Sequence, residues 1–280
     1  MGAWRGDFYL WVRSRGAWIA VLVPALVAFA QVALRKLIVL RGAVEVVGGQ
    51  AQVAEQAELT TNAWAPFVEA VSRGVQIGVP IFVALVALCV VREREWGTVR
   101  LPLIRGGSSR ARWLLRRWLV LHVVILLALV LLIGAAAAGG ALWFDFGNIE
   151  EEGYVYLSSE EILEEFRTAF GAAYVALHAA VALALVCSVA APSPAAAVLA
   201  ALFGTYASDV IQGMVGDARH TLFAEYLPTL RDGAPLDQVR RLAEGYSDVD
   251  AFDTGVLWWP FAEGWVLLGL ALVIFRRRRV

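Results

Sequence analysis

Few side chains in this 280-residue chain could carry out chemistry, and they are widely separated. The three histidines, His122, His178 and His220, lie in different segments, so their spacing predicts no metal site. Cys89 and Cys187 both lie in apolar runs and give neither a disulfide framework nor a CxxC pair. The sequence contains no GxxxxGK[ST] phosphate-binding loop, HExxH or GxSxG motif. We therefore expect no catalytic, cofactor-binding or metal-binding residue, and no enzymatic activity in this chain.

Several polar residues lie within or near long apolar runs, which is a costly position at membrane depth. Ionisable groups there usually face a bundle interior or a substrate pathway. We take His178, Asp209 and Glu263 as candidates for a translocation path. Interhelical hydrogen bonding and solvation at the membrane interface are the alternative interpretations for the same residues.

The elements that must position these residues are apolar helices. Hydrophobic residues make up 60% of the chain, which exceeds the usual share of a soluble domain. A membrane span needs roughly 20 apolar residues. Pro192 and Pro194 divide one long apolar stretch into a hairpin of two spans. The sequence thus predicts one all-α polytopic transmembrane domain over 1–280. Its six spans are expected at about 17–34, 75–91, 118–143, 168–190, 195–215 and 255–275.

Segregation of charge predicts the orientation of these spans. Arginines gather before the first span, between the second and third, where eight lie from Arg92 to Arg117, and after the last at Arg276 to Arg279. Acidic residues fill the alternate connections, among them 144–167 and 216–254. Because cytoplasmic loops carry the excess of positive charge, we expect both termini in the cytoplasm of a bacterium and both acidic loops outside its inner membrane.

The N-terminal segment 1–16 is predicted to be an interfacial helix. Trp4, Phe8, Trp11 and Val12 share one helical face, as in helices that lie along a membrane surface. Ordinary aromatic-belt residues are an alternative. A signal peptide cleaved after 28–30 (Ala-Phe-Ala) is another, but it would leave five spans and break the charge pattern.

The acidic loops are expected to contain short helices of their own. Ser158 and Glu161 form a capping-box pattern that predicts a short acidic helix before the fourth span. Pro235 begins a second pattern, which Gly245 closes. An extracytoplasmic protein is a candidate partner for these loops. Glu150 to Glu152 could gather cations, and a solvated acidic loop is the alternative interpretation of these residues.

The connector 92–117 has arginines interleaved with apolar residues. Such a segment can lie on the membrane surface and bind anionic lipid or dock a partner protein. Positive-inside topology alone would account for its arginines, but it leaves Glu93, Glu95 and the pair Gly97-Thr98 unexplained.

These residues resemble the cytoplasmic segment of type-2 ABC exporter permeases. The run from Glu93 to Arg100 reads E-R-E-W-G-T-V-R and is followed by Ser109-Arg110. It is similar to the family pattern E-x-E-x-G-T and a later P-x-S-R step. Gly107 replaces the proline of that step, and Arg116 or Arg117 replaces a later lysine. The closest resemblance is to permeases whose ATPase is a separate chain.

The resemblance implies a permease that dimerises, as a homodimer or with a related chain, and is driven by two ABC ATPase subunits that bind ATP and Mg²⁺. The connector would be the coupling helix between spans two and three. A non-transporting membrane scaffold or sensor and a secondary transporter are the alternatives, and no nucleic-acid partner is expected. The implied ATPase-coupling residues are Glu93, Glu95, Gly97, Thr98, Arg100, Arg105, Ser109 and Arg110.

Overall fold

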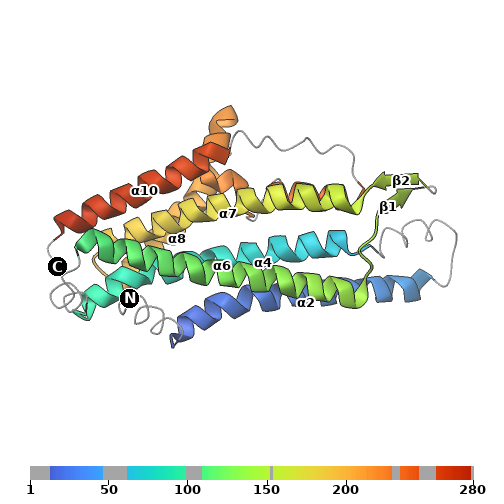
Figure 1. Ribbon diagram of the computed structural model, residues 1–280, viewed down its shortest axis with the longest axis horizontal. Coiled ribbons are helices and arrows are strands. Elements are labelled where there is room, and N and C mark those ends of the chain that lie inside the picture. Colours follow the sequence, from blue (N-terminus) through green and yellow to red (C-terminus); the bar gives the residue numbers. More distant parts are fainter. Residues whose placement is uncertain are drawn as a thin grey trace.

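A computed structural model describes the chain as a bundle of long helices (Figure 1). The described residues are 13–46, 62–98, 109–151, 154–212, 214–228, 234–245 and 257–278. The interfacial helix predicted for 1–16 lies almost wholly outside them. The long helices are α2 (Arg15–Val46), α4 (Trp64–Glu95), α6 (Arg110–Trp143), α7 (Ser159–Ala190), α8 (Pro194–Gln212) and α10 (Trp258–Arg277). The short elements are β1 (Ile149–Glu151), β2 (Tyr154–Leu157), the 3-10 helices η1 (Gly216–Thr221) and η2 (Phe223–Tyr226), and α9 (Pro235–Ala243).

The predicted fold class is confirmed, because six of these helices are long and apolar enough to cross a membrane. The helices extend beyond several of the predicted spans. Helix α4 begins at Trp64, whereas the sequence predicted a span from Val75, and α6 begins at Arg110 instead of Trp118. Apolarity marks the part of a helix that lipid surrounds, but the helix itself continues through polar residues until a cap or a breaker ends it.

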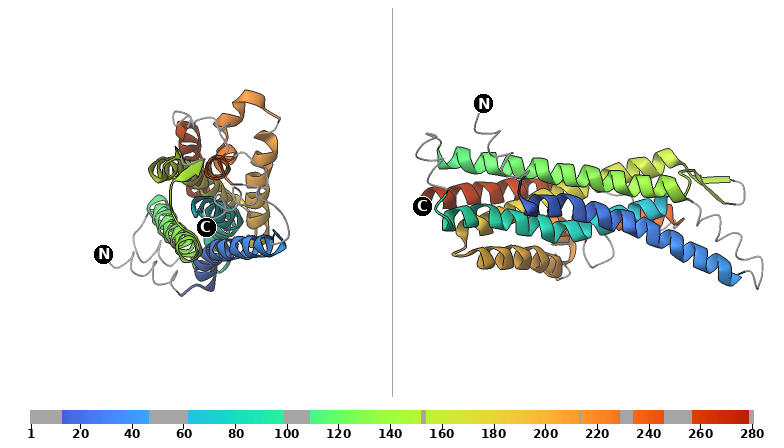
Figure 2. Two further views of the ribbon diagram at one scale, coloured as in Figure 1. Left: turned by 90° about the vertical axis from the view of Figure 1, so that its right-hand side faces the viewer. Right: turned by 90° about the horizontal axis from the view of Figure 1, so that it is seen from below.

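The helices align at one end, which we call the arginine-rich end. Helices α4, α7 and α10 end there, and α6 and α8 begin there (Figure 1). Helices α8 and α10 have 19 and 20 residues, about 30 Å each, which matches the hydrocarbon thickness. Helices α4, α6 and α7 have 32 to 34 residues, about 50 Å. Their additional length extends toward the opposite end, which carries β1 and β2 and which we call the hairpin end (Figure 2).

The hairpin end has an aromatic core of its own. The rings of Trp64 and Phe67 on α4 pack against Phe146 and against Phe166 of α7, with ring centroids 4.9 to 5.9 Å apart. The Trp64 indole also donates a hydrogen bond to the Ser159 hydroxyl at 3.2 Å. These contacts hold together the parts of α4 and α7 that exceed the length of one hydrocarbon span.

The capping box at Ser158 is confirmed, but the separate acidic helix is not. The Ser158 hydroxyl accepts from the Glu161 amide at 3.3 Å, and the Glu161 carboxylate accepts from the Ser158 amide at 2.8 Å. The helix that begins here continues as α7 to Ala190. Ile162 and Phe166 are buried on the same face as the apolar residues that follow, and no glycine or proline interrupts this first part of the helix.

Two other local predictions are confirmed. Pro192 and Pro194 separate α7 from α8, and α8 begins at Pro194. Helix α9 begins at Pro235 and is followed by Gly245, whose φ of 88° is favourable mainly for glycine. Helix α9 packs against α4 and α7, and the Ser72 hydroxyl donates to Asp237 at 3.1 Å.

Candidate functional site

The motif at the end of α4 forms a helix C-cap. The Thr98 amide donates to the Glu93 carbonyl at 2.9 Å, and the Gly97 amide donates to the Arg94 carbonyl at 3.0 Å. These are the two hydrogen bonds of a Schellman motif. Gly97 has a φ of 69°, in the left-handed region that glycine occupies without a Cβ clash. The Thr98 hydroxyl adds a third bond to the Glu93 carbonyl at 3.0 Å. Gly97 and Thr98 therefore end α4 and turn the chain into the connector.

The carboxylate of Glu93 ties the end of α4 to α6. It forms an ion pair of 2.6 Å with Arg117, whose side chain is 6% exposed. The Arg117 guanidinium also lies over the Trp113 ring, 5.5 Å from its centroid. Trp113 in turn stacks on Phe275 of α10 at 5.5 Å. One carboxylate thus connects α4, through α6, to α10.

Arginines on either side of the connector hold the ends of two other helices. Arg94 donates to the backbone carbonyls of Val189, at 3.0 Å, and Ala191, where α7 ends. Arg110 donates to the carbonyl of Arg278 at 2.6 Å, just after α10. Arg278 donates to the carbonyl of Val189. The carbonyls at a helix C-terminus lack helical partners and carry partial negative charge, so cationic donors are well matched to them.

The remaining residues of the motif face outward. Glu95 is exposed, and Trp96 is 64% exposed. The Arg92 guanidinium lies 4.8 Å from the centroid of the Trp96 ring, a cation–π contact that orients the indole. Ser109 caps α6 by accepting from the Arg112 amide at 3.3 Å. Arg100 and Arg105 lie outside the described residues.

The arrangement has a mechanical capability. Both flanks of the connector are fixed by buried or charge-assisted contacts to α6, α7 and α10, while Glu95 and Trp96 remain accessible to another molecule. A force on the connector would therefore be transmitted to four helices at once, because these contacts leave little freedom for either flank to move alone.

The structure pairs two histidines that lie 56 residues apart in the chain. Because a carbonyl can only accept, the Nδ1 of His122 carries the proton and donates to the Trp118 carbonyl at 3.0 Å. The Nε2 of His122 then accepts from the Nδ1 of His178 at 3.1 Å. This leaves the Nε2 of His178 as a buried atom without a hydrogen-bond partner among the described residues. His178, a predicted path residue, therefore links α7 to α6.

The sequence could have indicated His122 as a partner of His178, because the two residues lie at similar positions along their helices. Both histidines lie about three turns from the arginine-rich end of their helices, which places them at one level of the bundle. The described residues contain no group of three or more His, Cys, Asp or Glu side chains that could hold a metal ion.

Asp209 and Glu263 have other surroundings. Asp209 is buried on α8, with 8% of its surface exposed. Glu263 of α10 accepts from the Phe223 amide of η2 at 3.1 Å. His178, Asp209 and Glu263 thus lie on three helices, and the contacts described for His178 and Glu263 are with different residues.

Six membrane-capable helices and a cationic end with structured caps define this chain as a helical multi-pass membrane protein. The sequence model of the DUF2705 family, described as a protein of unknown function, matches residues 52–247. The chain belongs to this family. The matched region contains Glu93, Arg117 and both histidines of the pair, but not α10. A comparison with curated proteins finds no significant match.

Proposed function

We propose that this chain is the membrane-spanning permease subunit of an ATP-driven exporter whose ATPase is a separate polypeptide. The observation that supports it best is the division of the motif into two sets of residues. Glu93 and Arg94 are turned inward and anchor the helix, whereas Glu95 and Trp96 are exposed at its end. A docking segment needs both features, an accessible surface and a rigid attachment to the helices that it moves.

In this proposal the arginine-rich end lies in the cytoplasm of a bacterial cell, with the hairpin end outside. Two ATPase subunits dock on segment 92–117 of two permease copies and supply the ATP site. Closure of the ATPases pushes the connector. The Glu93–Arg117 ion pair and the Arg94 contacts pass this displacement to α6 and α7, which changes the tilt of the bundle.

The proposal is tested by co-purification with the ABC ATPase that we expect a neighbouring gene to encode. Glu95→Lys combined with Trp96→Ala should reduce the amount of ATPase retained and its stimulation by about tenfold or more, because both side chains are exposed and are not part of the anchor. Glu164 is also exposed and lies near the start of α7, so Glu164→Lys is the matched control and should retain the ATPase.

Unchanged retention and stimulation in the Glu95→Lys/Trp96→Ala variant would contradict docking at this segment. The absence of an ABC ATPase gene nearby, with a kinase gene in its place, would favour the membrane scaffold or sensor instead. A purified chain that moves substrate with an ion gradient and no ATPase would favour the secondary transporter.

A further inference from the structure

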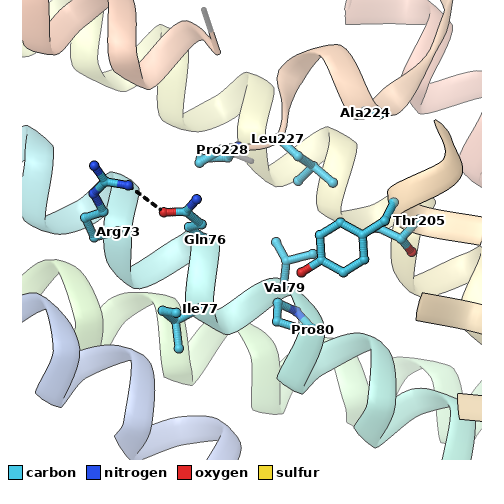
Figure 3. A pocket seen from close by; sticks show the side chains of 10 residues that line it. Arg73, Gln76, Ile77, Val79, Pro80, Thr205, Ala224, Leu227 and Pro228 are labelled. Atoms are coloured by element: carbon cyan, nitrogen blue, oxygen red, sulfur yellow. Dashed lines mark hydrogen bonds between the residues drawn. The ribbon is translucent and has the colours of Figure 1, made fainter. Parts of the chain in front are cut away.

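A cavity of about 260 Å³ lies between α4, α8 and η2, away from the arginine-rich end. Its walls are mainly apolar and include Ile77, Val79 and Pro80 on α4, and Leu227 and Pro228 after η2 (Figure 3). Thr205 of α8 lines the side of the cavity opposite to Arg73 (Figure 3). An apolar cavity of this size would accept hydrocarbon more readily than a polar solute.

One cation stands at the rim of this cavity. Arg73 is exposed and donates to the Gln76 amide oxygen at 2.9 Å, and both side chains lie at the same end of the cavity (Figure 3). Glu69, one helical turn before Arg73, instead accepts from Gln31 of α2 at 3.0 Å. Among the described residues, no carboxylate forms an ion pair with Arg73, so its charge is available to an anion.

The depth of these residues fits a membrane interface. Arg73 lies 22 residues before Glu95 in the chain, and thus about 33 Å along α4 from the arginine-rich end. Pro80 lies about 22 Å from the same end. We place one boundary of a hydrocarbon layer about 30 Å thick at the arginine-rich end. Arg73 then falls at the level of the head groups on the other side, and the apolar wall falls within the hydrocarbon.

The other charged groups near the cavity favour an orientation in which the anionic head group of a ligand lies at Arg73. Asp209, the acidic residue of α8, lies one turn from Tyr206 in the cavity wall and about 22 Å from the start of α8. Its carboxylate lies deeper in the bundle than Arg73 and offers no positive charge to an anionic head group there. Glu225, beside the lining residue Ala224, forms an ion pair with Arg219 at 3.3 Å.

We propose that this cavity binds an anionic amphiphile, with its head group at Arg73 and Gln76 and one hydrocarbon chain against Val79, Pro80 and Leu227. The inference goes beyond the proposed function and does not require an ATPase. The shared chemistry is one acyl chain with an anionic head group, which a free fatty acid or an anionic phospholipid can supply.

Photocrosslinking of the full-length protein in phosphatidylcholine nanodiscs tests this proposal. The probe is a fatty acid with a diazirine in its chain, compared with its uncharged methyl ester, and the labelled peptides are identified by mass spectrometry. The fatty acid should label the peptides that contain Val79 and Leu227, and the ester should label them about tenfold less, since a charge-assisted hydrogen bond is lost.

Arg73→Gln should reduce this labelling about tenfold. Arg167→Gln, an exposed arginine at a comparable distance from the hairpin end of α7, is the matched control and should leave it unchanged. Equal labelling of the two variants, equal labelling by acid and ester, or labelling confined to the arginine-rich end would each overturn the proposal.

Two further measurements identify the ligand and test the apolar wall. If a photoreactive phosphatidylglycerol labels the same peptides better than the fatty acid does, the ligand is a phospholipid. If the fatty acid labels them better, the ligand is a free acid. Labelling of these peptides by neither probe would overturn the site. Unlabelled fatty acids should compete about fourfold better for each added methylene until the cavity is filled. Competition independent of chain length would contradict a hydrocarbon site.

Discussion

At the scale of single residues, the motif at the end of α4 has a structural role that its pattern alone does not reveal. Gly97 is required by a left-handed turn, and Glu93 contributes both a carbonyl to the cap and a carboxylate to Arg117. A buried guanidinium whose counter-ion is removed is much more costly than the same site without either charge. The ion pair therefore makes the position of the connector depend on Glu93.

Glu93→Ala should lower the free energy of unfolding by about 3 kcal/mol, because the buried Arg117 loses this ion pair. The double variant Glu93→Ala/Arg117→Met should recover much of that loss, since it removes both charges and Met fills most of the space of the Arg117 side chain. Thermal and denaturant unfolding in detergent measure both effects. A double variant no more stable than Glu93→Ala would show that the ion pair is not the source of the loss.

At the scale of elements, the close contact between α7 and α10 depends on a glycine facing a histidine. A Cβ at Gly264 would overlap the ring of His178. The rings of Trp118 and Trp265 surround that histidine, with centroids 5.4 and 5.7 Å from it. Small residues at helix crossings allow backbones in a membrane to approach closely. Gly264 therefore sets the separation of the two helices at the histidine pair.

Gly264→Ala should destabilise the protein by about 2 kcal/mol, because overpacking forces α10 away from α7. Adding His178→Ala should relieve the overlap, so the double variant should be more stable than the sum of the two single effects predicts. Gly269→Ala on the same helix is the control, because its added Cβ would meet no atom within 4 Å. Strictly additive losses in thermal unfolding would contradict this contact.

At the scale of the whole molecule, the unequal lengths of the helices divide the bundle. Helices α8 and α10 match one hydrocarbon thickness, whereas α4, α6 and α7 extend beyond it at the hairpin end. The aromatic core around Trp64 and Phe166 holds these extensions together. About 20 Å of each of these three helices therefore exceeds the length that one hydrocarbon layer requires, on the side opposite to the arginines.

Thiol labelling in intact cells tests the orientation of this bundle. In a background with Cys89→Ser and Cys187→Ala, Ser109→Cys should react with an impermeant maleimide only after the cells are opened. Tyr154→Cys, in the β-hairpin and 80% exposed, should react in intact cells. This result is expected because the arginine-rich end carries the positive charge that cytoplasmic segments retain. The reverse labelling pattern would contradict both the orientation and the proposed function.

The features that could be predicted from the sequence are those that neighbouring residues determine. The lengths of the apolar runs predicted six membrane-capable helices, and the prolines after α7 predicted that α7 and α8 form a helical hairpin. The capping box at Ser158 and the turn at Gly245 could also be predicted, because a helix cap depends only on residues within one or two turns of the helix end. The orientation, the docking of an ATPase and the structure of segments 1–12 and 99–108 remain predictions.

Tertiary structure alone decided which side chains meet. Glu93 and Arg117, His122 and His178, and the walls of the cavity beside Arg73 come from different helices. The acidic helix that the sequence predicted as a separate element forms the first turns of α7, because these turns pack against α4. A sequence specifies which residues share one face of a helix, but the rotation and depth of each helix against its neighbours depend on how all their surfaces pack together.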